Sequence, residues 1–176
     1  MKRKLFYCIL CIFPVLLGFQ TSFEADANVR LKSVFIYNFT RYIDWPSDYK
    51  TGSFVIAYFG KSSKVIAELN KMALSKTVGT QKIEIRIVTK LSEIGKANIL
   101  YVSPDVETPL VDIIKTTKGK SILVVTESIG FAKKGATINF VIVDNRQKFE
   151  LNQANAEKNH LKVSSSLLAL AIPVTN

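Results

Sequence analysis

The stretch "ANILYVSPDVETPLVDIIKTTKGKSILVVT" (97–126) decides the fold class, because a helical segment separates two short apolar runs. The runs "ANILYVS" (97–103) and "SILVVT" (121–126) are largely apolar, which is typical of strands covered by helices on both faces of a sheet. Between them, Pro104 opens a polar turn, and residues 109–116 carry apolar side chains at helical spacing. A strand, a helix and a second strand in this order indicate an α/β domain.

The flanking segments extend this pattern in both directions. Before it, "SFVIAYFG" (53–60) predicts a strand, "SSKVIAELNKMAL" (62–74) a helix capped by Ser62 or Ser63, and "KIEIRIV" (82–88) a strand with one buried and one wet face. After it come the strands "ATINFVIVD" (136–144) and "KFELN" (148–152), joined by a turn at 144–147, and two short helices that begin at Asn152 and at serines 164–166. We therefore predict a three-layer α/β domain with a mixed β-sheet flanked by helices, ending in a C-terminal hairpin and short helices.

The aromatic segment "FIYNFTRYIDWP" (35–46) belongs to a helix that Pro46 ends. Its apolar positions cover more than one side, so we expect Phe35, Phe39, Tyr42 and Ile43 to be packed. Tyr37 falls in a narrow polar stripe, and it is the aromatic side chain that we expect to face water or a partner.

The first residues have the organisation of a secretory signal. A basic start at 2–4 precedes an apolar run at 5–19, and Ala25-Asp26-Ala27 supplies the small residues that signal peptidase requires. We predict a cleaved signal peptide at 1–27 and a single domain at 28–176; an uncleaved anchor is the alternative. Both cysteines, Cys8 and Cys11, would leave with the signal, so the exported domain would have no disulfide.

Charge and motifs exclude several function classes. The formal net charge is +10, but export and dispersed lysines argue against nucleic acid, leaving a basic soluble surface, with anionic lipid headgroups or an acidic partner as the alternative. The segment "FGKSS" (59–63) lacks a phosphate-loop glycine, since Val55 stands where one is needed. The one histidine, His160, follows Asn159 at a predicted helix end, where a left-handed residue is common. We predict no catalytic residues, no metal and no cofactor.

Four segments together resemble the YfiR-like family of exported regulators. They are Tyr37-Asn38-Phe39 with Trp45-Pro46, the strand "GATINF" (135–140), the strand "FELN" (149–152), and the closing segment 161–168 with its serines and leucines. The resemblance spans the chain after the predicted signal. It implies a periplasmic, often dimeric α/β domain that is not an enzyme.

The resemblance also implies a partner. The best-known member restrains the periplasmic domain of an inner-membrane diguanylate cyclase, so that its release raises cyclic-di-GMP and promotes biofilm growth. In the family the repressing surface involves the C-terminal elements, which puts Phe140 and Glu150 forward as partner-binding residues, with Trp45 and Tyr37 as further candidates. The best-known member carries disulfides, and a chain without cysteines after the signal cannot share redox control.

A small-ligand binding module, associated with another membrane sensor or transporter, is the alternative function. In this reading the loop 127–135 closes over the carboxyl edge of the sheet, where α/β domains usually bind ligands.

Overall fold

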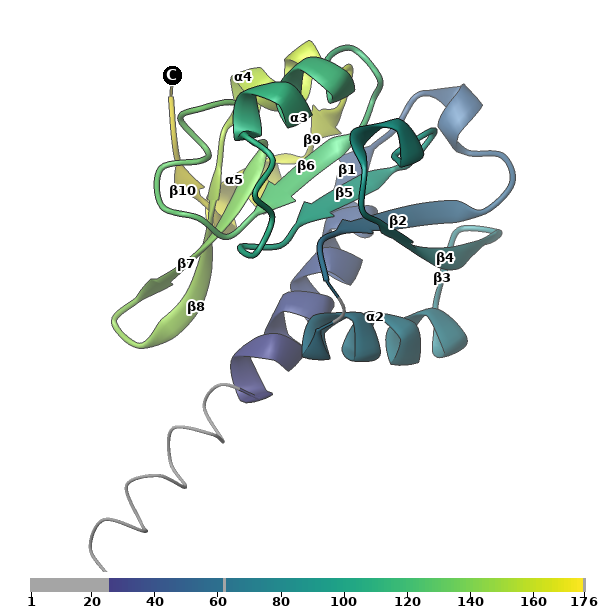
Figure 1. The fold of residues 1–176 in the computed structure, drawn as a ribbon, viewed down its shortest axis with the longest axis horizontal. Coiled ribbons are helices and arrows are strands. Elements are labelled where there is room, and N and C mark those ends of the chain that lie inside the picture. Colours follow the sequence, from purple (N-terminus) through teal and green to yellow (C-terminus); the bar gives the residue numbers. More distant parts are fainter. Residues whose placement is uncertain (1–25, 62, 176) are drawn as a thin grey trace, which may run out of the picture.

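The computed structural model describes residues 26–61 and 63–175. Residues 26–42 form an N-terminal helix, and the rest of the chain alternates strands with short helices (Figure 1). The elements are β1 (Ile43–Asp44), η1 (Ser47–Tyr49), β2 (Phe54–Phe59), α2 (Lys64–Ser75), β3 (Thr77–Val78), β4 (Gln81–Val88), η2 (Leu91–Glu93), β5 (Ile99–Val102), α3 (Leu110–Thr117), β6 (Leu123–Thr126), β7 (Ile138–Val143), β8 (Arg146–Leu151), α4 (Gln153–Lys158), β9 (Lys162–Val163), α5 (Ser165–Leu170) and β10 (Ile172–Pro173).

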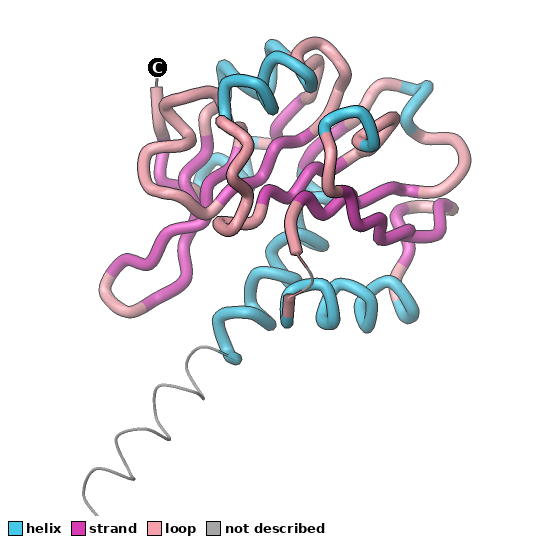
Figure 2. Tube along the Cα trace, viewed as in Figure 1, coloured by secondary structure: helices cyan, strands magenta, loops and turns pink. Residues whose placement is uncertain are grey.

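The main sheet has eight strands in the order β10-β8-β7-β6-β5-β2-β4-β3 (Figure 2). The pairs from β4 through β2, β5 and β6 to β7 are parallel, whereas β7–β8 and β3–β4 are antiparallel. The central strands β2, β5 and β6 are buried along their whole length, as expected for strands covered on both faces. The predicted α/β class with a mixed sheet is confirmed.

Two cores lie on the two faces of the sheet. The N-terminal helix and α2 cover one face, and α3 covers the other (Figure 1). The first core holds most of the large aromatic side chains, including Phe39, Tyr58 and Tyr101. The second core is built from smaller aliphatic side chains such as Val124 and Ile113. Strand alternation sends neighbouring residues of one strand into opposite cores.

The N-terminal helix is buried on one side only, so the prediction that it packs on more than one side is wrong. Ile36 and Phe39 are fully buried, whereas Tyr42 is 37% exposed. Leu31 and Val34 lie on the same outer face and are also exposed. The helix rests on one face of the sheet, and none of the described elements covers its other side. Apolar periodicity in a helix therefore overstated its burial.

The burial of side chains along strand β4 departs from the predicted alternation at the C-terminal end of the strand. Ile83 is buried as expected, but Ile87 is half-exposed and its neighbour Val88 is buried instead. The strand lies near the sheet edge, with only the two residues of β3 beyond it. Ile87 shares the face of Ile83 but lies beyond the first core at the end of the strand, whereas Val88 points into the second core.

The turn between β7 and β8 is shorter than predicted, and residues with positive φ lie where the chain reverses direction. The loop between β7 and β8 is two residues long, because Val143 pairs with Arg146, and the predicted four-residue turn at 144–147 is too long. Asp144 and Asn145 adopt positive φ values of 51° and 56°, as the tight hairpin turn requires. His160 also has a positive φ, 56°, directly after Asn159, the C-cap of α4, as predicted for a helix end.

The helices α2, α4 and α5 have N-cap residues at the predicted positions, although the side chain of one of them makes no capping hydrogen bond. Asn152 and Ser164 cap α4 and α5, and their side chains accept hydrogen bonds from Asn155 N and Leu167 N. Ser63 is the cap residue of α2, but its hydroxyl lies 2.8 Å from the Tyr58 hydroxyl and makes no cap bond.

The predicted signal peptide, 1–27, lies outside the described residues except for its last two positions. Within the described part of the chain, every helix is too short or too polar to span a bilayer.

Candidate functional site: a groove beside the β7–β8 hairpin

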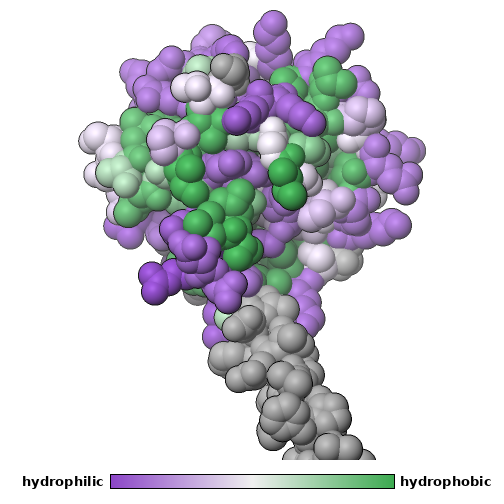
Figure 3. Space-filling model, turned by 90° about the vertical axis from the view of Figure 1, so that its left-hand side faces the viewer, coloured by the Kyte–Doolittle hydropathy of each residue, from purple (hydrophilic) through white to green (hydrophobic). Residues whose placement is uncertain are grey.

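A groove lies between the N-terminal helix and the β7–β8 hairpin, and we call it the hairpin groove. Its volume is about 610 Å³. Seen from this side of the molecule, hydrophobic surface gathers among hydrophilic side chains (Figure 3). The groove is lined by Asn28, Val29, Lys32, Glu127, Ile129, Phe140, Val141, Ile142 and Gln147.

The groove exists because the hairpin extends past the sheet. Strand β7 pairs with β6 only at Ile138 and Asn139, so from Phe140 outward it is supported by β8 alone. Alternation places Ile138, Phe140 and Ile142 on one face. The first two are buried in the core, whereas Ile142 lies beyond it and is 54% exposed.

The loop after β6 supplies a second exposed apolar side chain. Ile129 is 97% exposed and lines the same groove as Ile142. Sequence reasoning missed both isoleucines. The available signal for Ile129 was an isoleucine inside the largely polar loop "ESIGFAKKG" (127–135), because a surface loop offers an apolar side chain no core to pack into.

A nearly buried ion pair joins the two walls of the groove. The Lys32 ammonium of the N-terminal helix pairs with the Glu127 carboxylate, and their side chains are 16% and 14% exposed. The Tyr101 hydroxyl donates a hydrogen bond to the other oxygen of Glu127. The Tyr101 ring stacks on Tyr58 with 5.2 Å between centroids. This network fixes the start of the loop against the helix.

The environment of Tyr101 predicts a specific pH dependence. Burial, followed by the nearby Glu127 charge, raises the pKa of Tyr101 well above its ordinary value of 10.0. A raised pKa in the folded state means that Tyr101 loses its proton only in the unfolded chain as the pH passes about 10. The contribution of Tyr101 to the free energy of unfolding should therefore be constant below that pH. Above it, this contribution should fall by about 1.4 kcal/mol per pH unit.

Urea unfolding at a series of pH values between about 8 and 11 measures this effect. The variant Tyr101→Phe should be less stable at neutral pH and should show a shallower decline above pH 10. An identical slope in both proteins would contradict the assignment.

Glu150 belongs to a polar chain on the face opposite Phe140. The Thr126 hydroxyl donates to Asn139 Oδ1 at 2.7 Å, and Asn139 Nδ2 donates to Glu150 Oε2 at 2.9 Å. Glu150 is half-buried and pairs with Ile172 of the edge strand β10. Phe140 and Glu150 are therefore close in the hairpin but point to opposite faces of the sheet.

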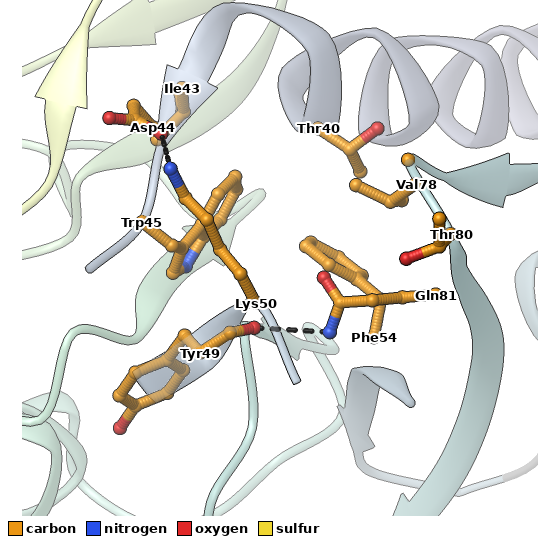
Figure 4. Close-up of a pocket in the computed structure, with 11 residues that line it drawn as sticks. Thr40, Ile43, Asp44, Trp45, Tyr49, Lys50, Phe54, Val78, Thr80 and Gln81 are labelled. Carbon is orange, nitrogen blue, oxygen red and sulfur yellow. Dashed lines mark hydrogen bonds and ion pairs between the residues drawn. The ribbon is translucent and has the colours of Figure 1, made fainter. Parts of the chain in front are cut away.

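Trp45 is a core residue rather than a surface aromatic. It is 5% exposed, its indole N–H donates to the Asn98 carbonyl at 3.2 Å, and its ring packs nearly perpendicular to the Phe54 ring, with 5.1 Å between the centroids. It lines a smaller cavity of about 250 Å³, in which Lys50 pairs with Asp44 at the rim (Figure 4).

Tyr37 packs against the end of α2. The Lys76 ammonium lies 5.9 Å from its ring centroid, and its hydroxyl lies 3.5 Å from the Thr77 carbonyl oxygen. The most exposed tyrosine of this helix is instead Tyr42. Of the four predicted partner-binding residues, only Phe140 lines the hairpin groove; the partner-binding role of Glu150, Trp45 and Tyr37 stays a prediction.

The side-chain chemistry around the groove suits binding. Among residues 26–61 and 63–175, no three His, Cys, Asp or Glu side chains come together as metal ligands would. The groove lining contains one carboxylate, which an ammonium and a tyrosine hydroxyl already engage. Apolar side chains and an open shape are typical of a protein or ligand contact.

Comparison with known proteins places the chain in a family. Among solved structures, it is similar to the ABC domain from Streptococcus pneumonia in complex with L-Trp, with 12% identity and a TM-score of 0.49. That match covers 69% of this chain, and this chain spans about half (55%) of the matched one. No curated protein sequence matches it. The model of the YfiR/HmsC-like family matches residues 29–172, so the chain belongs to the YfiR/HmsC-like family, known as periplasmic regulators in cyclic-di-GMP signalling.

Proposed function

We propose that this protein is a non-enzymatic periplasmic regulator that binds and restrains an inner-membrane signalling protein of the diguanylate cyclase type. Membership of the YfiR/HmsC-like family supports the signalling context. The observation that carries the binding surface is the hairpin groove, where Ile129 and Ile142 stand exposed beside buried Phe140. Such restraint would lower cyclic-di-GMP and limit biofilm growth.

Restraint follows from differential binding. A regulator shifts its partner toward the inactive state only by as much as it binds that state more tightly. The two isoleucines would be the apolar anchors, because groups that lose water at the centre of an interface dominate its energy. Lys32 and Glu127 hold the start of the loop that carries Ile129 against the N-terminal helix, whereas Ile142 is carried by β7.

A small-ligand binding module is the second candidate function. The volume of the hairpin groove, about 610 Å³, is within the range of ligand sites, and Glu127 and Ile129 of the predicted closing loop line it. A screen of metabolites and peptidoglycan fragments by thermal shift tests this function. A melting temperature that stays fixed for every compound removes it.

The variant Ile142→Asp tests the regulatory function at its anchor. A charge placed at an apolar contact should weaken co-purification with the membrane partner by about 30-fold or more, while leaving the exposed hairpin folded. Cells carrying this variant should show raised cyclic-di-GMP. Capture from solubilised membranes and a cyclic-di-GMP reporter are the two readouts.

Leu74→Asp is the matched control. Leu74 is 90% exposed on α2, away from the groove, so the same chemical change there should leave both readouts at the wild-type level. Equal behaviour of the two variants would overturn the proposed surface. Recovery of a second copy of this chain, with no membrane protein, would assign the groove to a homodimer instead.

A further inference from the structure

Four lysines gather around one pocket between the ends of α3 and α4, which we call the lysine pocket. They are Lys118, Lys133, Lys134 and Lys158. The pocket has a volume of about 620 Å³, and Ile114, Gly135, Asn155 and Asn159 complete its lining. Among the described residues that line it, none is acidic. These lysines are dispersed along the chain, so the fold creates this cluster.

The charges of the cluster are uncompensated within the described chain. None of the four lysines forms an ion pair with a described residue, whereas Lys32, Lys50, Lys64 and Lys71 do. The Lys158 ammonium donates a hydrogen bond to Asn155 Oδ1 at 3.4 Å, and the Lys134 ammonium lies 6.0 Å from the Phe131 ring centroid. Like charges around one hollow repel, and an anion between them relieves that repulsion.

Helix ends explain half of this arrangement. Lys118 caps α3 and Lys158 ends α4, where cations offset the negative end of the helix dipole. Lys133 and Lys134 belong instead to the loop between β6 and β7, which has no helix end to offset. The β6–β7 loop therefore adds two ammonium groups to the pocket, beside the two at the helix ends.

The walls of the pocket are held by hydrogen bonds that are buried or partly buried. Asn159 accepts from Gly119 N at 3.0 Å and donates to the Ile122 carbonyl at 3.1 Å, which ties the end of α4 to the turn after α3. Asn155 donates to the carbonyls of Ala132 and Ala136, on either side of the two loop lysines.

Gly135 fixes the loop against α3. It has a φ of +121°, and a Cβ at this position would lie 2.9 Å from Ile114 Cγ1. The backbone that carries Lys133 and Lys134 therefore packs directly on the helix. Because the loop backbone is fixed, binding an anion would order the exposed lysine side chains but need little change in the backbone.

We propose that the lysine pocket binds a phosphate-bearing ligand of at least two negative charges. Lysine suits phosphate as a point charge, whereas planar carboxylate recognition favours arginine, and the lining holds no arginine among the described residues. The volume exceeds what one phosphate fills, so the ligand carries a second charged group or an organic part. The phosphate comes from a soluble ester or from a lipid headgroup.

The test uses the full mature chain and inorganic pyrophosphate as probe. Calorimetric titration at about 50 mM salt should show saturable binding, and about 0.5 M salt should remove it. The double variant Lys133→Gln/Lys134→Gln should bind at least about tenfold more weakly. The control Lys82→Gln/Lys162→Gln removes the same charge at exposed positions outside the pocket and should change affinity by less than about twofold.

Vesicles distinguish the two sources of phosphate. Flotation with phosphatidylglycerol vesicles that depends on Lys133 and Lys134, without pyrophosphate binding, assigns the pocket to a lipid headgroup. Pyrophosphate binding without flotation assigns it to a soluble ester. The proposal is overturned when neither probe binds, or when the two double variants lose affinity equally.

Discussion

Replacing Trp45 by alanine should destabilise the protein by about 3–5 kcal/mol, which is the cost of removing a large buried aromatic side chain. The indole is 5% exposed and fills the space between the first core and Asn98. The substitution leaves a cavity against Phe54 and leaves the Asn98 carbonyl without the indole donor. Because Trp45 is the single tryptophan of the chain, far-ultraviolet circular dichroism in urea must measure the change.

Trp45→Phe separates packing from hydrogen bonding. It keeps a ring against Phe54 but loses the N–H donor, so the expected loss is about 1–2 kcal/mol. A Trp45→Ala protein that unfolds at the wild-type urea concentration, yet fails to bind its partner, would show that Trp45 acts in recognition rather than in the core.

Replacing Glu127 by glutamine should destabilise the protein by about 2–4 kcal/mol. Glutamine keeps an acceptor for the Tyr101 hydroxyl but leaves the Lys32 ammonium, at 16% exposure, without its counter-charge. Breaking one half of a buried ion pair costs more than the pair contributes, because an uncompensated charge stays out of water. Urea unfolding at neutral pH measures the loss.

The double variant Lys32→Met/Glu127→Gln tests that reasoning. It removes the orphaned ammonium as well, so it should be more stable than Glu127→Gln alone and within about 1.5 kcal/mol of the wild type. Losses that simply add would show that the two side chains do not interact in solution.

The order of strands and helices could be predicted because it rests on local patterns. The apolar runs at 97–103 and 121–126, and the helix between them, appear as β5, α3 and β6. The caps at Asn152 and Ser164 were also readable, since capping depends on residues three positions away. The exposure of Leu31, Val34 and Tyr42 was not predictable, because it depends on which elements pack on the helix.

The candidate site was harder to predict because it forms where the β7–β8 hairpin extends beyond the part of β7 that pairs with β6. Nothing local in "ATINFVIVD" (136–144) shows that β6 stops pairing after Asn139 and leaves Ile142 exposed. The same holds for the lysine pocket, whose members come from the ends of α3 and α4 and from the loop 127–135. Sequence spacing treats them as scattered, and only the tertiary fold brings them together.

The short pairing of β1 with β9 joins segments from opposite ends of the described chain. Ile43 pairs with Val163 and Asp44 with Lys162, so the end of the N-terminal helix is fastened to residues near the other end of the chain. Closing so long a loop is entropically costly and slow, and it cannot happen before β9 is available. Should the predicted signal export the chain through a membrane pore, the helix would reach the far side undocked, and the last segment to arrive would complete the first core.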